Sequence, residues 1–289
     1  MFGFFLTNCR TEIVKPPINA PIREITDDLG RNIRLPETIE RAVSLAPNLT
    51  EIVFAVGAGD KLVGRTSYDN FPPEAQKIQT IGDTMNPNIE NIIALKPNIV
   101  LISTASQIET FTKTLDQQNI VYFVTNPNNL EDIYKSINQI GEIFGKSDRA
   151  REIVESLKKR VAEVEAKTKN TEKPKVFLQV SKDSIYTIGK DSYITDLISR
   201  AGGVSVTKNV TTAYFPLSKE TAAALNPDVI ILSESEDNLT PNDALKNSPA
   251  VKNGKVFKIN ADIISRPSPR IVDALEQIAR MLHPEFWQI

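Results

Sequence analysis

The chain carries the same short pattern twice, about 130 positions apart. Residues 89–103 read IENIIALKPNIVLIS, and residues 219–233 read KETAAALNPDVIILS. In both copies an acidic residue opens a short helix, a proline follows the end of that helix, and an apolar run begins shortly afterwards. Proline cannot continue a helix because it lacks the N–H, and the apolar run has the length and branching of a buried parallel strand. Two such units predict two similar α/β lobes with a ligand cleft between them.

A single long helix is predicted between the two lobes. Apolar residues recur at helical spacing from Asp148 to Lys167, with charged residues elsewhere and no Gly or Pro inside. A helix of about 20 residues extends roughly 30 Å, which makes a rigid joint between two mostly parallel sheets. The chain thus divides into an anchor and tether (1–22), an N-terminal lobe (23–145), a linking helix (146–170) and a C-terminal lobe (171–289).

Local patterns predict the elements of each lobe. We expect a β-hairpin over residues 23–35 and a helix over Glu51–Val56 that Asn48 or Thr50 caps. A strand is expected at 176–180 and a closing helix at 271–282. Tyr68, Tyr186, Tyr214 and Phe215 are expected to lie in loops.

Composition excludes several classes of function. The net charge of −2 offers no basic face for nucleic acid. No apolar run approaches the roughly 18 residues of a membrane span. With one cysteine and one histidine, the chain can form neither an internal disulfide nor a Cys/His metal cluster. His283 is expected to be structural or exposed, and no phosphate-binding glycine loop is present.

The N-terminus, MFGFFLTNCR, resembles the end of a bacterial lipoprotein signal. In such signals a Leu and small residues precede a cysteine that is lipidated, here Cys9. The apolar segment is shorter than a complete signal core, which a start site placed too far downstream would explain. The polar, Pro-containing stretch after Cys9 suits a tether between an anchor and a domain. The alternative is an N-terminal tail whose thiol is unmodified.

Segments in both lobes resemble, in order, the periplasmic substrate-binding proteins with a helical backbone. These proteins serve ABC importers of vitamin B12, haem and ferric siderophores. The matching segments are SLAPNLTEIVFAVGAG (44–59), SYDNFPPEAQKI (67–78), NIENIIALKPNIVLI (88–102), KVFLQV with YTIGKDSY (within 175–193), FPLSKE (215–220) and SRPSPRI (265–271). The resemblance implies a monomeric binding protein rather than an enzyme, located in the periplasm or at the cell surface.

The resemblance also implies a ligand, and the members that bind vitamin B12 match most closely. Aromatic rings cover the broad face of a corrin with few rotatable bonds to freeze. The implied contacts are aromatic residues in loops and a polar pair after the last strand. At the position of Thr84 the B12-binding members have Trp, and the neighbouring methionine is expected to supply contact area there. These residues are Tyr68, Tyr186, Tyr214, Phe215, Asp262, Arg266 and Met85. No cofactor other than this cargo is implied.

The repeated acidic residues have a second implied role. In this family each lobe presents one exposed Glu to an Arg of the permease dimer, and Glu90 and Glu220 match those positions. The alternative is that each Glu only favours its own helix dipole.

Two rival functions stay open at the level of sequence. A ferric-siderophore or haem receptor on the same scaffold could use Arg65 and Arg266 for anionic groups, with a Tyr as the haem ligand. A two-lobe enzyme of the chelatase type shares the architecture, but the scarcity of His and Cys argues against it.

Overall fold

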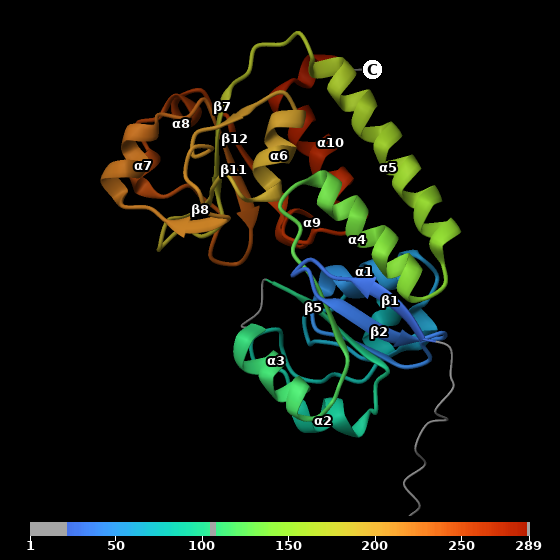
Figure 1. Ribbon diagram of the computed structural model, residues 1–289. Helices are drawn as coiled ribbons and strands as arrows, with labels where there is room; N and C mark the ends of the chain where they lie inside the picture. The colour runs from blue at the N-terminus through green and yellow to red at the C-terminus, as the bar shows by residue number, and fades with distance from the viewer. Residues whose placement is uncertain (1–21, 105–107, 288–289) are drawn as a thin grey trace, which may run out of the picture.

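The computed structural model describes residues 22–104 and 108–287, and they form two α/β lobes joined on one side (Figure 1). The helix α5 (Ser147–Thr168) runs along that side from one lobe to the other. Lys146 precedes α5 and provides no side-chain cap. The buried residues of α5 fall on one stripe, as the sequence periodicity predicts. Cys9 lies outside the described residues.

The N-terminal lobe is built on a four-stranded parallel sheet of order β4-β3-β5-β6. Its strands are β3 (Ala42–Ser44), β4 (Leu62–Gly64), β5 (Ile99–Ser103) and β6 (Tyr122–Thr125). Its helices are α1 (Pro47–Ala55), α2 (Ile89–Ala94), α3 (Ile108–Gln117) and α4 (Leu130–Ile143), with 3-10 turns at Gly59–Lys61 and Pro73–Lys77. The hairpin of β1 (Ile22–Thr26) and β2 (Asn32–Pro36) packs beside this sheet.

The C-terminal lobe has a four-stranded parallel sheet of order β12-β11-β7-β9. Its strands are β7 (Lys175–Gln179), β9 (Val204–Ser205), β11 (Val229–Glu234) and β12 (Val256–Asn260). Its helices are α6 (Tyr193–Arg200), α7 (Lys219–Leu225), α8 (Pro249–Lys252), α9 (Ala261–Ile264) and α10 (Ile271–Leu282), with 3-10 turns at Asp243–Leu245 and Pro284–Trp287. The short strands β8 (Tyr186–Ile188) and β10 (Tyr214–Pro216) form a separate antiparallel pair. The two parallel-sheet lobes confirm the fold predicted from the repeat.

The repeat extends to backbone conformation. Lys96 follows the C-cap of the first helix and Asn226 is the C-cap of the second, and they have positive φ angles of 47° and 46°. Asn98 and Asp228 each lie one residue after a proline. The side chain of Asn98 accepts from the two backbone N–H groups just before β3, and that of Asp228 accepts from the first N–H of β7. The strands that follow, β5 and β11, are both interior strands of their sheets. The two copies therefore have the same structural role in their lobes.

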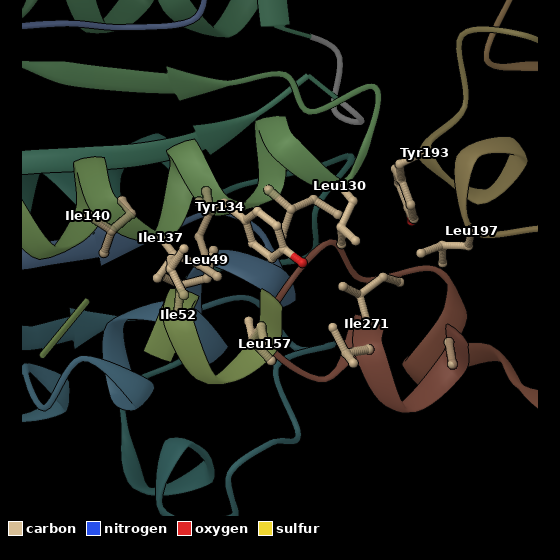
Figure 2. Packing of buried hydrophobic residues seen from close by; sticks show 14 of the residues in the cluster. Leu49, Ile52, Leu130, Tyr134, Ile137, Ile140, Leu157, Tyr193, Leu197 and Ile271 are labelled. Carbon is tan, nitrogen blue, oxygen red and sulfur yellow. The ribbon is translucent and has the colours of Figure 1, made fainter. Parts of the chain in front are cut away.

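One hydrophobic core continues through both lobes. Residues of α1, α4, α5, α6 and α10 belong to a single buried cluster, part of which Figure 2 shows around Tyr134. Leu130 and Ile137 of the first lobe, Leu157 of α5, and Leu197 and Ile271 of the second lobe lie in it together. The outer faces of the two sheets have smaller cores of their own, under α2 and α3 and under α7 and α8. A hinge motion would have to break the shared core, so the joint is stiffer than a lone helix would make it.

Polar contacts reinforce the joint beside this core. Asp196 of α6 accepts a hydrogen bond from the backbone N–H of Leu130, which begins α4, at 3.0 Å. Arg200 of α6 pairs with Glu165 of α5 at 2.9 Å. These contacts connect three helices from different parts of the chain.

Two local predictions were wrong. Helix α1 begins at Pro47 rather than Glu51, and Ala46 precedes it without a side-chain cap, so neither Asn48 nor Thr50 caps it. Pro47 starts the helix because its fixed φ suits the first helical position. Tyr186, Tyr214 and Phe215 lie in the strands β8 and β10 rather than in loops. The sequence did not reveal these strands because three residues are too few to show an alternating pattern.

Within 22–104 and 108–287, no helix has both the length and the apolarity that crossing a membrane requires.

Candidate ligand-binding cleft

A cavity of about 590 Å³ opens between the two lobes. Its N-terminal wall follows the carboxyl ends of β3, β5 and β6, where parallel α/β sheets usually bind ligands. Its C-terminal wall comes from the start of α6, from β10 and from the segment after β12. The lining residues are Ala46, Pro47, Asn48, Tyr68, Thr84, Ser103, Thr104, Asn126, Pro127, Asn128, Asp191, Ser192, Tyr193, Ala213, Tyr214, Asp262, Ser265, Arg266 and Pro267.

Three tyrosines give the cavity its aromatic surface. Tyr68 of the first lobe is 57% exposed and Tyr214 of the second is 40% exposed, so both rings are open to a ligand. Tyr193 is buried, and its hydroxyl donates to the carbonyl of Ile264 at 3.2 Å. Burial raises the pKa of Tyr214, whose hydroxyl lies beside the side chains of Tyr193 and Ser192. The Tyr214 phenol therefore stays protonated at neutral pH.

The remaining polar lining is mostly uncharged. Ser, Thr and Asn side chains from both lobes contribute hydroxyl and amide groups. Thr104 donates to the side-chain oxygen of Asn126, and Asn128 donates to the Asn126 backbone carbonyl at 3.2 Å. Such groups bind neutral polar substituents and can both donate and accept hydrogen bonds.

Arg266, the one arginine among the described lining residues, is held by contacts within the protein. Arg266 bonds to Glu51 at 3.0 Å, to Asn70 at 2.7 Å and to Asp262 at 2.6 Å. It also donates to the backbone carbonyl of Tyr68 at 3.2 Å. Because these contacts occupy both terminal nitrogens, the guanidinium anchors the wall of the cavity and its charge is already compensated.

Glu51 is the centre of this network, and sequence reasoning missed it. Besides Arg266, its carboxylate accepts from Ser268 at 2.6 Å and from Arg270 at 3.0 Å. Glu51 lies on α1 of the first lobe, whereas Ser268 and Arg270 precede α10 of the second. An acidic residue among the buried apolar positions of a helix was the available signal, since buried carboxylates need partners.

The structure brings some of the predicted ligand residues together and leaves others outside. Tyr68, Tyr214, Asp262 and Arg266 line the cavity, as does Thr84. Met85, Tyr186 and Phe215 do not. Phe215 follows Tyr214 along β10, so its side chain points to the opposite face of the β8–β10 pair. Tyr186 of β8 pairs with Pro216, two positions beyond Tyr214. Met85 is exposed on a turn where Asp83 accepts its backbone N–H at 2.7 Å.

Arg65, considered for anionic ligands, does not reach the cavity. Its buried guanidinium donates to the backbone carbonyls of Ala75, Thr66 and Gln76 at 2.9, 2.7 and 3.2 Å. It therefore holds the loop after β4 in place, and it is not among the described residues that line the cavity.

The repeated glutamates lie on the outer helices of the two lobes. Glu90 and Glu220 each occupy the second position of a short helix, α2 and α7, after the capping residues Asn88 and Ser218. Both side chains are exposed. Figure 1 shows α2 and α7 on different lobes, away from α5.

No group of described residues has the composition of a metal site.

His283 is buried at the end of α10, where its Nε2 lies 3.2 Å from the carbonyl oxygen of Gly202. It lines no part of the interlobe cavity. The histidine is structural, as expected.

Comparisons with known proteins agree with this architecture. A family model described as periplasmic binding protein matches residues 43–263. An ABC transporter substrate-binding lipoprotein of Bacillus subtilis is 31% identical over 90% of this chain and 85% of its own length. A vitamin B12-binding protein of Vibrio parahaemolyticus is 29% identical over 84% of this chain and 89% of its own.

A solved structure shares the whole two-lobe arrangement. The periplasmic vitamin B12-binding protein of Vibrio cholerae superposes with a TM-score of 0.75 at 27% identity, covering 86% of this chain and 99% of that one. Together with the family match over most of the sequence, this makes the chain a member of the periplasmic binding protein family, a substrate-binding protein of the ABC transporter type.

Proposed function

We propose that the protein captures a corrinoid such as vitamin B12 outside the cytoplasm and delivers it to an ABC importer. The chemistry of the cavity lining carries this proposal: open aromatic rings on both lobes and a polar surface of amides and hydroxyls. A corrinoid presents a broad, partly apolar macrocycle with carboxamides around its edge. Aromatic faces and uncharged donors and acceptors suit those two features. The similarity to vitamin B12-binding proteins of Vibrio supports the same ligand class.

The charges around the cavity favour a ligand without carboxylates. Asp191 and Asp262 line it, and the charge of Arg266 is already matched by Glu51 and Asp262. A ligand with free carboxylates, such as haem, would meet the acidic Asp191 and no uncompensated cation among the described lining residues. That arrangement opposes binding by like-charge repulsion.

A haem or ferric-siderophore receptor is the second candidate function. Its iron would need an anionic protein ligand, and a tyrosine phenolate is the group available in the cavity. The raised pKa of Tyr214 disfavours the phenolate, which weakens this alternative. Catalysis forms no part of the proposal, because the described cavity lining holds neither His nor Cys.

Three further roles belong to the proposal. Tyr186, Phe215 and Met85 would contact parts of the ligand that extend beyond the cavity. Glu90 and Glu220 would dock the loaded protein onto the permease dimer, one glutamate for each half. Cys9 would carry a lipid anchor, which mass spectrometry of the protein purified from bacterial membranes can test.

The direct experiment is a calorimetric titration of the purified protein with cyanocobalamin. We expect one-to-one binding with a dissociation constant below about 1 μM, equivalent to about −8 kcal/mol. Haemin and a ferric siderophore, titrated in parallel, should bind at least about a hundredfold more weakly. Absence of heat with cyanocobalamin beside clear binding of either iron ligand would overturn the proposal.

A further inference from the structure

One polar side chain in the wall of the cavity, that of Asn48, has no hydrogen-bond partner among the residues that the structure describes. Asn48 is the second residue of α1 and lines the cavity, and it is only 5% exposed. Nearby polar side chains are hydrogen-bonded within the protein: Glu51, Thr50 and Asp69 all have partners. The Asn48 amide forms no hydrogen bond with any described residue. Buried amides in proteins nearly always have a partner, so this one calls for an explanation.

The Asn48 amide is reachable from the cavity. The described side-chain atoms that are both fully enclosed and unbonded belong to Thr125, Tyr134 and Gln139. The amide atoms of Asn48 are not among them, so they keep contact with space outside the protein. Since Asn48 lines the interlobe cavity, that contact is with the ligand space.

The start of α1 adds backbone polarity at the same point. Ala46 provides no side-chain cap, and Pro47, the first helical residue, has no N–H. The first-turn N–H groups of a helix have no partner within the helix, which leaves the N–H of Asn48 as a donor beside its own side chain. The positive end of the helix dipole favours an acceptor oxygen here. Together, the side-chain amide and the backbone N–H of Asn48 offer N–H donors and one acceptor oxygen on one side of the cavity.

We infer that Asn48 is a specificity-determining residue that pairs with a peripheral carboxamide of the ligand. The ligand carbonyl accepts from Asn48, and the ligand amide N–H donates to the Asn48 side-chain oxygen. A carboxylate in the same place lacks that N–H and brings a negative charge into a cavity that the acidic Asp191 already lines. Asn48 thereby distinguishes an amide from an acid. This inference rests on the proposed corrinoid function.

The test compares cyanocobalamin with its monocarboxylic acids, in each of which one peripheral carboxamide has been hydrolysed. Calorimetry is done with the wild-type protein and with Asn48→Leu, which keeps the size of the side chain but removes its donors and acceptor. Asn91→Leu is the matched control, because Asn91 lies near the start of another helix of the same lobe and outside the cavity. Thermal unfolding of each variant establishes that it is folded, and Asn48→Ala replaces Asn48→Leu if the leucine disturbs the fold.

The wild-type protein should bind one of the monoacids about tenfold more weakly than cyanocobalamin. Asn48→Leu should weaken cyanocobalamin binding about tenfold and remove the preference over that monoacid. Asn91→Leu should behave as the wild type does. If the wild-type protein binds cyanocobalamin and every monoacid with equal affinity, the role of Asn48 is overturned and the proposed function stands. The same holds if Asn48→Leu binds cyanocobalamin as tightly as the wild type does. A wild-type protein that binds no corrinoid overturns the proposed function and this inference with it.

Discussion

Glu51 of the first lobe and Arg266 of the second form an ion pair across the lobe boundary, with 3.0 Å between Oε1 and Nη1. Their side chains are 2% and 8% exposed. The same carboxylate also holds Ser268 and Arg270, and the same guanidinium reaches Asn70 and the backbone of Tyr68. The ion pair thus connects helix α1, through Glu51, to the segment before α10, and through Arg266 to the loop that carries the cavity-lining Tyr68.

Neutralising Glu51 should destabilise the protein strongly. In Glu51→Gln, Arg270 loses its anionic partner and Arg266 retains Asp262 alone. Removing one member of a buried ion pair costs about 3–5 kcal/mol, and the partial exposure of Arg270 places the expected loss near 3 kcal/mol. The free energy of unfolding in urea measures it. Glu24→Gln, which breaks the exposed pair with Arg34, is the control and should cost less than about 1 kcal/mol. Equal losses in the two variants would contradict a buried interlobe link.

Removing the ring of Tyr68 should weaken ligand binding without unfolding the protein. The side chain is mostly exposed in the cavity wall, so Tyr68→Ala leaves little unfilled space in the core. We expect cyanocobalamin affinity to fall about tenfold, because an aromatic anchor typically contributes more than 1 kcal/mol. Tyr68→Phe, which keeps the ring, should retain most of the affinity. Phe286→Ala, at an exposed aromatic residue outside the cavity, should have no effect, and a similar loss there would rule out a local role for Tyr68.

The buried carboxyl of Asp69 should make stability depend on pH. Burial raises its pKa above the ordinary value of 3.8, although Thr50 and Thr66 donate to it. The folded state therefore holds the proton more tightly than the unfolded state does. Stability from this group is greatest below 3.8 and decreases as the pH rises through the folded-state pKa.

Asp69→Asn tests that sign. The variant has no proton to lose, so the wild type should become less stable relative to it as the pH rises from about 3.8. Unfolding free energies of both proteins over that range give the difference directly, and contributions from other groups cancel. A difference that moves the opposite way with pH would show that the carboxyl is instead stabilised in its charged form.

The double variant Glu90→Ala with Glu220→Ala should separate transport from binding. Both side chains are exposed and lie outside the cavity, so cyanocobalamin affinity should stay within about twofold of the wild type. Uptake by cells that depend on this protein should be lost, since docking needs both glutamates. The control is Glu155→Ala with Glu163→Ala, two exposed glutamates of α5, which lies on the other side of the molecule (Figure 1). Lost affinity in the first variant, or lost uptake in the second, would contradict the docking role.

Some of the architecture follows from local sequence. Proline after a short helix, and a run of branched apolar residues after that proline, predicted β5 and β11 and therefore two lobes. The apolar stripe of residues 148–167 predicted α5 in the same way. Such patterns report on neighbours a few positions away, which is the range that helix and strand periodicity covers.

The cavity depends on contacts that no local pattern contains. Asn70 and Asp262 are bonded at 2.8 Å although 192 positions separate them in the sequence. Family resemblance led to Tyr68, Tyr214, Asp262 and Arg266, but it also included Tyr186, Phe215 and Met85, which the register of β8 and β10 and the turn at Asp83 place elsewhere.

The sequence by itself determined the two lobes, the helix between them and the scarcity of catalytic side chains. Only the tertiary structure decided that Arg266 is paired with Glu51 and that Arg65 serves its own loop. It alone placed Asn48 in the wall of the cavity with no hydrogen-bond partner among the described residues. The reason is physical: periodicity encodes which face of an element is buried, whereas the partners of a buried polar group are set by how distant segments pack.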